Sequence, residues 1–377
     1  MPSRAEQLQK LGQSVWFDFI RRGHLRSGEF ERLVRDSGVV GVTSNPTIFQ
    51  QAIAGSGDYD EAITRGAAAG LSGPELFEAL AVEDIQLACD LLAPVAARTH
   101  ALDGRVSIEV SPRLAHDTAR TVEEALRLHR EVARPNVMVK VPATAAGLPA
   151  IAELTGRGLS INVTLIFSLT RYEQVMDAYL SGLERLVAGG GNPASVHSVA
   201  SFFVSRVDSK VDAAIDARIA AGAPREELAG LKGRAAVANA RLAYARFREV
   251  FGGARFQTLS ARGAHLQRPL WASTSTKNPA YPDTLYVDEL IGADTVNTMP
   301  LATLQAFNDH GVLESRIGQG LDSAGALFRR LPELGVTLDA LIAQLEGEGV
   351  EAFLKSYEAL LETLESRRAT LSGKSAS

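Results

Sequence analysis

Cysteine is almost absent from this sequence: Cys89 is the one cysteine among 377 residues. An intrachain disulfide is therefore excluded, which is typical of proteins that fold in a reducing compartment. The N-terminal segment has no apolar core of the kind that signal peptides carry. No stretch approaches the roughly 18 uninterrupted apolar residues that a membrane-spanning helix needs. These absences predict a cytoplasmic protein with no membrane partner.

An excess of positive charge is absent as well. The 39 lysines and arginines are outnumbered by 44 aspartates and glutamates, and no basic stripe or tail stands out. This distribution argues against a nucleic-acid partner. The seven histidines are scattered without a metal-ligand spacing, and no glycine-rich segment completes a nucleotide-binding motif. The residues thus predict neither a metal site nor a nucleotide site.

What the sequence does contain is a regular alternation of short β-rich runs and longer amphipathic segments. Helical periodicity is clear over residues 118–132, 169–186 and 234–250. Alternating strands and helices predict parallel strands, and eight strand–helix units favour a (β/α)8 TIM barrel over a doubly wound sheet. The predicted strands cover residues 14–19, 39–44, 106–110, 137–141, 161–167, 199–204, 270–274 and 294–299.

The chain is longer than a minimal barrel. Additional helices are predicted before residue 14, after residue 323 and over the long span 208–251. No linker rich in proline, glycine or serine divides the chain, so we predict one barrel domain over residues 1–366. Residues 367–377 are predicted to form a flexible C-terminal tail, because the last of them are small and polar.

Lys140 stands out among the charged residues. It lies in the apolar run Val137-Met138-Val139-Lys140-Val141-Pro142, which reads as a buried strand. Removing an ammonium group from water is costly, so the pKa of a buried lysine tends to fall. A neutral amine is the form that attacks a carbonyl carbon to make a Schiff base. Lys140 is therefore a candidate nucleophile.

Polar side chains interrupt or end nearly every predicted strand. They are Asp18, Asn45, Glu109, Asn162, Thr164, Ser201 and Ser273. The C-terminal ends of the strands of a parallel barrel meet at one face and form the active site. One buried carboxylate alone is more often structural, but a polar residue on nearly every strand predicts a shared site. Asp18 and Glu109 are its candidates for proton transfer.

The order and spacing of several segments resemble those of transaldolases over roughly residues 14 to 310. These segments are TSNPTIF (43–49), VSIEV (106–110), VKVPAT (139–144), INVTLIFS (161–168) and SFFVSR (201–206). Each is weak alone, and their combination is specific. The segment WASTSTKNP (271–279) resembles the longer bacterial branch, which includes transaldolase domains fused to phosphoglucose isomerase.

The resemblance implies a transfer reaction that needs no cofactor. A dihydroxyacetone unit would pass from sedoheptulose 7-phosphate to glyceraldehyde 3-phosphate, giving erythrose 4-phosphate and fructose 6-phosphate. This is a step of the non-oxidative pentose phosphate pathway. The expected partners are therefore phosphorylated ketoses and aldoses, and the expected assembly is a monomer or a homodimer.

The same resemblance implies catalytic roles for four residues. Lys140 aligns with the Schiff-base lysine. Glu109 and Thr164 align with the pair that handles water and protons as the carbinolamine forms and dehydrates. Asp18 aligns with the acid/base that takes the proton from the C4 hydroxyl of the donor.

Substrate-binding residues follow from the resemblance and from the strand positions. Asn45, Asn162 and Ser201 align with groups that hold the dihydroxyacetone moiety, and Ser273 is a further expected substrate-binding residue because it holds a comparable strand position. Arg206 aligns with a phosphate-binding arginine. Many transaldolases have a second such arginine after strand seven, where this sequence has none. We expect Lys277 to supply the second positive charge.

Three other functions remain open from sequence. A related class I aldolase would release free dihydroxyacetone from fructose 6-phosphate, although such relatives are usually much shorter. A catalytically inactive barrel could serve as a scaffold, but the retained Lys140, Glu109, Asp18 and Thr164 argue against it. A metal-dependent class II aldolase would need clustered histidines, which the sequence lacks.

Overall fold

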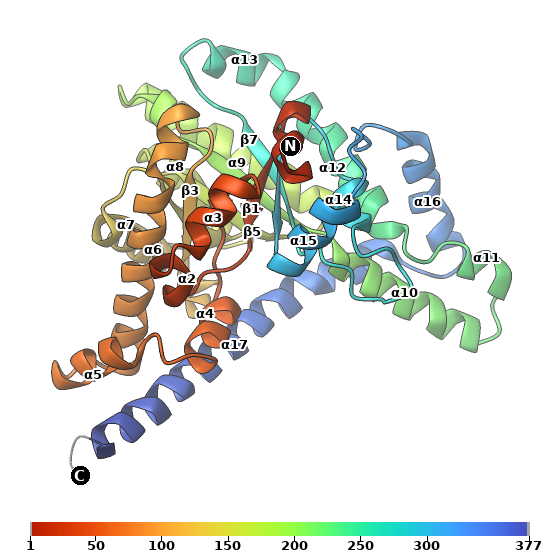
Figure 1. Ribbon diagram of the computed structural model, residues 1–377. Helices are drawn as coiled ribbons and strands as arrows, with labels where there is room; N and C mark the ends of the chain where they lie inside the picture. The colour runs from red at the N-terminus through yellow and green to blue at the C-terminus, as the bar shows by residue number, and fades with distance from the viewer. Residues whose placement is uncertain (1, 375–377) are drawn as a thin grey trace.

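Eight parallel strands form a closed barrel in the computed structural model, which describes residues 2–374 (Figure 1). Each strand pairs with its neighbour in sequence, and β1 pairs with β8 to close the barrel. The strands are β1 (Gln13–Phe17), β2 (Val39–Val42), β3 (Arg105–Glu109), β4 (Val137–Pro142), β5 (Ile161–Ile166), β6 (Ser198–Phe203), β7 (Gln267–Ala272) and β8 (Thr295–Met299). The predicted (β/α)8 fold with additional terminal helices is confirmed.

Helices surround the barrel and extend the chain at both ends. The α-helices are α1 (Arg4–Leu8), α2 (Arg22–Arg26), α3 (Glu29–Asp36), α4 (Pro46–Ala54), α5 (Asp60–Ala68), α6 (Gly73–Arg98), α7 (Thr118–Val132), α8 (Gly147–Gly156), α9 (Leu169–Ala188), α10 (Ser205–Ala220), α11 (Arg225–Ala229), α12 (Ala235–Gly252), α13 (Ala254–Ser260), α14 (Leu285–Asp288), α15 (Leu301–His310), α16 (Leu321–Glu333) and α17 (Leu338–Lys374). Short 3-10 helices are η1 (Gln9–Leu11), η2 (Pro112–Leu114) and η3 (Pro193–Ser195). None of the helices between residues 2 and 374 is both long enough and apolar enough to span a membrane.

Helix boundaries follow local chemistry. The predicted helix at 118–132 coincides with α7, which begins where the Asp117 side chain accepts a hydrogen bond from the Arg120 amide. The long helical span predicted over 208–251 is instead divided among α10, α11 and α12. Gly222 and Gly233 adopt φ values of 90° and 69° in the two connections, a left-handed conformation that ends a helix and suits glycine.

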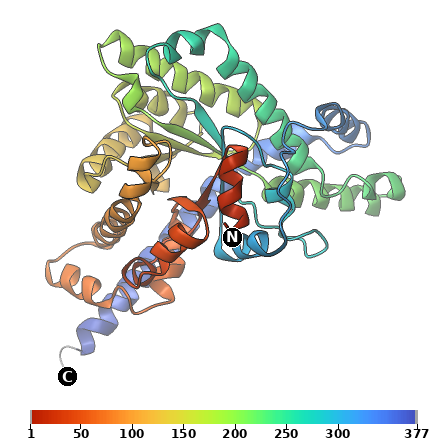
Figure 2. The ribbon, with the colours of Figure 1, turned by 45° about the horizontal axis from the view of Figure 1, so that its top comes forward.

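The C-terminal helix α17 crosses the end of the barrel where the strands terminate, which is called the mouth below (Figures 1 and 2). It packs against α4, α5, α10 and β5. Glu346 forms an ion pair with Arg171 at 2.9 Å, and the Ser356 hydroxyl accepts a hydrogen bond from Thr47 at 2.8 Å. A residue near the middle of α17 can therefore contact the active site of the barrel.

The boundary predicted between residues 366 and 367 falls inside α17. Arg367 donates hydrogen bonds to the carbonyls of Ile53 and Ser56 and pairs with Asp60 at 2.5 Å. These contacts tie the end of the helix to α4, to the loop after it and to α5, and the helix continues through residues 367–374 where a tail was predicted. Residues 375–377 of that predicted tail lie outside the described residues.

Candidate active site

A cavity of about 320 Å³ opens at the mouth of the barrel. Its wall combines residues from strand ends, from the loops that follow them and from α17. Seven of the ten residues predicted for the site line this cavity: Asp18, Asn45, Lys140, Ser201, Arg206, Ser273 and Lys277. The other three, Glu109, Asn162 and Thr164, lie on the strands beside Lys140 and its neighbours.

Lys140 is held inside the barrel by the register of three strands. Glu109 on β3 pairs with Lys140 on β4, which pairs with Asn162 on β5. Residues paired across parallel strands share a face of the sheet, so these three side chains enter the barrel at the same level. Lys140 is 3% exposed, and its Nζ donates to the carbonyl of Ser44 at 3.2 Å.

A carboxylate accompanies the buried lysine. The Oε2 atom of Glu109 lies 3.4 Å from the Nζ of Lys140. Burial raises the pKa of Glu109 to about 7, against an opposing effect from the positive charge of Lys140. A carboxyl group with this pKa exchanges protons readily near neutral pH, which suits general acid/base catalysis.

Glu109 and Thr164 share an unusual property. Glu109 Oε2 and Thr164 Oγ1 are buried, and neither makes a hydrogen bond to any described residue. Buried polar atoms without partners are costly, and they collect where a ligand or water supplies the missing bond. Both atoms are therefore available to bind water or substrate close to the amine of Lys140.

Asp18 lies across the barrel from Lys140, and two threonines hold its side chain in place. The Thr43 hydroxyl donates to Asp18 Oδ1 at 2.6 Å and lies 2.7 Å from the Thr298 hydroxyl. Burial is the main cause that raises the pKa of Asp18, while Thr43 and the positive charge of Lys140 oppose it. The carboxyl group is thus oriented and made more basic, as a proton acceptor requires.

An amide and two hydroxyls form a short network across β3, β5 and β6. Asn162 donates from Nδ2 to the Ser107 hydroxyl at 3.0 Å and accepts from the Ser201 hydroxyl at 2.7 Å. Asn45 is positioned differently, as the N-cap of α4, where its Oδ1 accepts from the Ile48 amide. These contacts hold polar groups toward a substrate with several hydroxyls.

Two cations at the mouth have no carboxylate partner. Arg206 and Lys277 form no ion pair with the described residues, although both line the cavity. Burial lowers the pKa of Lys277, and the positive charge of Arg206 adds to that effect, which indicates that the two side chains lie near each other. Arg206 occupies the first turn of α10, at the positive end of the helix dipole, which also favours an anion. This corner of the cavity is suited to a phosphate group.

The backbone is strained at two positions beside these side chains. Leu165 and Ser273 adopt φ values of 60° and 57°, a left-handed conformation that branched and bulky residues rarely accept. Leu165 follows Thr164 at an irregularity in the pairing of β5 with β6. The Ser273 hydroxyl lies 2.9 Å from that of Ser205, next to Arg206. Strain of this kind is maintained by surrounding structure and collects at functional sites.

Comparison with known proteins gives the context of this site. The family described as Transaldolase/Fructose-6-phosphate aldolase matches residues 15–364. The chain belongs to this family. It is 50% identical to Transaldolase 1 of Streptomyces avermitilis over 360 residues, which cover 95% of this chain and 94% of that protein. It is also 50% identical to the Transaldolase of Parafrankia sp. over 365 residues, 97% of this chain and 98% of that protein.

A third relative agrees with these two. The Transaldolase of Thermobifida fusca is 50% identical over 363 residues, which cover 96% of this chain and 97% of that protein. The family match over residues 15–364 covers nearly all of the barrel and extends into α17. The transaldolase resemblance recognised from sequence motifs is therefore confirmed.

The sequence analysis did not identify several other side chains of the site. Thr43 and Thr298 orient Asp18, and Ser107 supports Asn162. Threonine and serine in a strand carry no distinctive signal, although Thr43 and Ser107 lie two residues before the predicted site residues Asn45 and Glu109, which was a usable clue. Phe353 of α17 lies over Lys140, with 5.6 Å between Nζ and the ring centroid. No local pattern connects that helix to the barrel mouth.

The described residues also bear on metal chemistry. Between residues 2 and 374, no three histidine, cysteine, aspartate or glutamate side chains gather closely enough to hold a metal ion. The carboxylates of the mouth instead face Lys140 or a threonine hydroxyl. The side chains at the mouth supply an amine and two carboxyl groups as the reactive groups.

Proposed function

We propose that this protein is a transaldolase that transfers a dihydroxyacetone unit from a phosphorylated ketose to a phosphorylated aldose. The observation that carries the proposal is the buried amine of Lys140, 3.4 Å from Glu109, in a cavity that also contains Arg206 and Lys277. Relatives named transaldolase at 50% identity support the transferase over an aldolase that releases dihydroxyacetone. The donor and acceptor are those of the non-oxidative pentose phosphate pathway, which also supports a cytoplasmic location.

The first step is attack of neutral Lys140 on the C2 carbonyl carbon of the ketose. A C–N bond forms, the carbonyl oxygen takes a proton, and the resulting carbinolamine loses water to give a protonated imine. Glu109 Oε2 lies 3.4 Å from the amine, Thr164 Oγ1 lies on the neighbouring strand β5, neither makes a hydrogen bond to a described residue, and the pKa of Glu109 is about 7. We assign them to the proton transfers that accompany addition and loss of water.

The second step breaks the bond between C3 and C4 of the bound sugar. Asp18 accepts the proton of the C4 hydroxyl, the new aldehyde leaves, and the bonding electrons move into the protonated imine to give an enamine. The contact from Thr43 and the raised pKa of Asp18 support this assignment. The same steps in reverse join the enamine to the acceptor aldehyde.

Binding and shielding are assigned to the remaining residues. Asn45, Asn162, Ser201 and Ser273 contact the dihydroxyacetone portion, and Arg206 and Lys277 bind the phosphate. Phe353 lies over the amine and limits access of water. Shielding matters because an enamine protonated by solvent would release dihydroxyacetone before the acceptor arrives.

Borohydride trapping tests the nucleophile and the donor together. Incubation with fructose 6-phosphate and sodium borohydride should add one reduced dihydroxyacetone or sugar adduct, which peptide mass spectrometry should place on Lys140. Lys140→Arg should show no adduct and no turnover, because guanidinium stays protonated and forms no imine. Lys232→Arg is the matched control, since Lys232 pairs with Asp216 away from the mouth.

Two outcomes would count against the proposal. An adduct on another lysine, or none, would remove Lys140 as the nucleophile. Rapid release of free dihydroxyacetone from fructose 6-phosphate without an acceptor aldehyde would favour the aldolase instead. Light scattering of the intact chain tests the expected monomer or homodimer.

A further inference from the structure

A second cavity, of about 700 Å³, lies at the opposite end of the barrel from Lys140. Its wall includes Gln13, Arg105 and Ser198, the first residues of β1, β3 and β6. Met138 also lines it, two residues before Lys140 on β4, or about 7 Å along the strand. This cavity, called the lower cavity, is separate from the mouth where the proposed reaction takes place.

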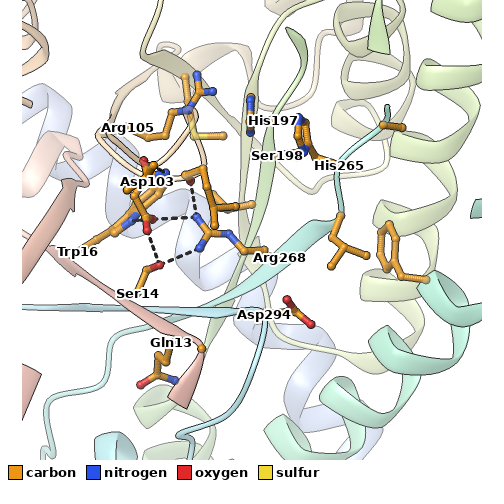
Figure 3. A pocket seen from close by; sticks show the side chains of 18 of the residues that line it. Gln13, Ser14, Trp16, Asp103, Arg105, His197, Ser198, His265, Arg268 and Asp294 are labelled. Atoms are coloured by element: carbon orange, nitrogen blue, oxygen red, sulfur yellow. Dashed lines mark hydrogen bonds and ion pairs between the residues drawn. The ribbon is translucent and has the colours of Figure 1, made fainter. Parts of the chain in front are cut away.

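One arginine of the lower cavity has a structural role that accounts for its charge. Arg268 donates to the Ser14 hydroxyl at 2.8 Å and to the Asp103 carboxylate at 3.0 Å (Figure 3). Asp103 also accepts from the Ser14 hydroxyl and from the Trp16 indole. Arg268 and Asp103 thus neutralise each other as a buried pair with satisfied hydrogen bonds.

Arg105 has no such compensation. It is 2% exposed, and its Nε and Nη1 donate to the carbonyls of Ala101 and Pro135. Its Nη2 makes no hydrogen bond to the described residues, and no carboxylate there forms an ion pair with it. Burying a charged group is costly unless it is paired, and Arg105 already lines a cavity that could admit a partner.

Asp294 does not supply that partner. It is the other carboxylate in the wall of the lower cavity, and it forms an ion pair with Arg248 at 3.3 Å. The lower cavity therefore contains two guanidinium groups against one carboxylate that faces them, Asp103.

Two histidines lie beside the two arginines of the lower cavity. The rings of His197 and His265 stack with centroids 4.2 Å apart, beside Arg105 and Arg268 in Figure 3. Burial lowers the pKa of His197 to about 2, and the positive charges of Arg105 and Arg268 add to that effect. Neither ring nitrogen of His197 makes a hydrogen bond to the described residues, although the residue is 7% exposed. A neutral imidazole N–H can therefore donate into the cavity.

We propose that the lower cavity binds a small phosphate-bearing anion, with Arg105 and His197 as its principal donors. The guanidinium fork matches the oxygen atoms of phosphate, and the imidazole adds a donor from a second direction. The anion neutralises Arg105, the arginine of the lower cavity that forms no ion pair with a carboxylate of the described residues. Inorganic phosphate and a sugar phosphate share this chemistry, and the test below distinguishes them. The site is independent of the proposed reaction at the mouth.

Imidazole NMR of the full chain tests this assignment directly. Every sample carries Arg206→Ala and Lys277→Ala, so that phosphate binding at the mouth is removed. Inorganic phosphate is added at constant ionic strength, with the His197 and His265 signals assigned from His197→Gln and His265→Gln. We expect saturable shifts at these two histidines, and an affinity at least tenfold weaker when Arg105→Gln is added. Glucose 6-phosphate is titrated in parallel: tighter binding identifies a sugar phosphate as the ligand, and equal affinity identifies the phosphate group alone.

Arg262→Gln is the matched control for the loss of charge. Arg262 is exposed three residues before His265 and does not line the lower cavity, so its loss should leave the titration unchanged. The proposal is overturned if the His197 and His265 signals do not move, or if Arg105→Gln leaves their titration unchanged. If Arg105→Gln fails to fold, the parent sample decides, because saturable shifts confined to these two histidines support the site and their absence refutes it.

Discussion

The titration of Glu109 makes the stability of the folded protein depend on pH. Its pKa is about 7 in the native protein, against an ordinary value of 4.5, because burial disfavours the charged form. Between these pH values the folded state binds a proton that the unfolded state has lost. The free energy of unfolding therefore falls as pH rises through this window.

We expect Glu109→Gln to remove that dependence. Relative to Glu109→Gln, the wild-type protein should lose on the order of 3 kcal/mol of unfolding free energy between about pH 4.5 and pH 7.5. Urea unfolding of both proteins across this range measures the difference. Glu362→Gln, an exposed change on α17, should give a difference that is independent of pH. A constant difference for Glu109→Gln as well would contradict the raised pKa.

Lys277 is the residue that we expect to replace the second phosphate-binding arginine that many transaldolases have after strand seven. Lys277→Ala should raise KM for fructose 6-phosphate about tenfold, the equivalent of roughly 1.4 kcal/mol, because one charge near the phosphate is lost. KM for unphosphorylated fructose should change little. Steady-state kinetics with both donors measure the contrast, and Lys232→Ala, remote from the mouth, is the control. An unchanged KM for fructose 6-phosphate would show that Lys277 is a solvated loop residue.

Individual residues differed in how far the sequence revealed them. Lys140 and Glu109 were predictable because a charge inside an apolar strand conflicts with its surroundings. Thr43 and Thr298 were not, because threonine is an ordinary residue of strands and its hydroxyl gives no warning of a partner. Arg105 escaped notice because the predicted strand begins at residue 106, one residue after it, and an arginine beside an apolar run gives no sign of burial.

At the level of elements, α17 completes the mouth from far along the chain. Phe353 lies over Lys140, and the ion pair of Glu346 with Arg171 and the bond from Thr47 to Ser356 fix the helix on either side. Contacts to α4, α10 and β5 spread the attachment over several elements. The position of Phe353 is therefore determined by the fold and not by local sequence.

Phe353→Ala should open a route for water to the enamine. We expect fructose 6-phosphate to yield free dihydroxyacetone faster without an acceptor, while transfer to an acceptor becomes slower, because protonation competes with carbon–carbon bond formation. An enzymatic assay for dihydroxyacetone measures this partition. Phe353→Leu preserves apolar volume and should remain close to wild type. An unchanged partition in Phe353→Ala would exclude the aromatic ring as the shield.

Helices and strands were predicted well where the hydrophobic periodicity is strong, and less well where a turn determines the end of an element. All eight strands and α7 follow from their patterns. The predicted span 208–251 missed two breaks, because a positive φ at Gly222 and Gly233 cannot be distinguished from a tolerated helical glycine by pattern alone. The end of α17 was missed because Arg367 and Arg368 are satisfied by carbonyls of residues about 300 positions earlier in sequence.

On the scale of the whole molecule, a polar network closes the lower end of the barrel. Arg268 of β7, Ser14 of β1 and Asp103 before β3 join strands from three parts of the sequence. These side chains are largely buried, so solvent screens their contacts only weakly. The network therefore supports barrel closure as a whole.

Arg268→Met should destabilise the protein by about 3–5 kcal/mol, because Asp103 remains buried without its cation. Lys232→Met removes the exposed pair with Asp216 and should cost less than about 1 kcal/mol. Urea unfolding monitored by tryptophan fluorescence measures both, with Trp16 next to the network as a reporter. Equal losses in the two variants would refute a structural role for the buried pair.

The barrel as a whole was predictable because the alternation of strands and helices restricts the topology to few choices. The two cavities at its ends were not equally predictable. The mouth contains charged and polar residues at the ends of apolar strands, and such residues indicate an active site in the sequence. The lower cavity is lined by side chains from loops and from the starts of strands, and only the folded chain brings these together.

The course of α17 also determines when the enzyme becomes competent during its own synthesis. Chains grow from the N-terminus, so all eight strands emerge from the ribosome before the helix that carries Phe353. A nascent barrel can then form with its reactive lysine still open to water and to cellular aldehydes and ketones. Protection of that amine therefore has to wait until α17 has been synthesised and packs across the mouth.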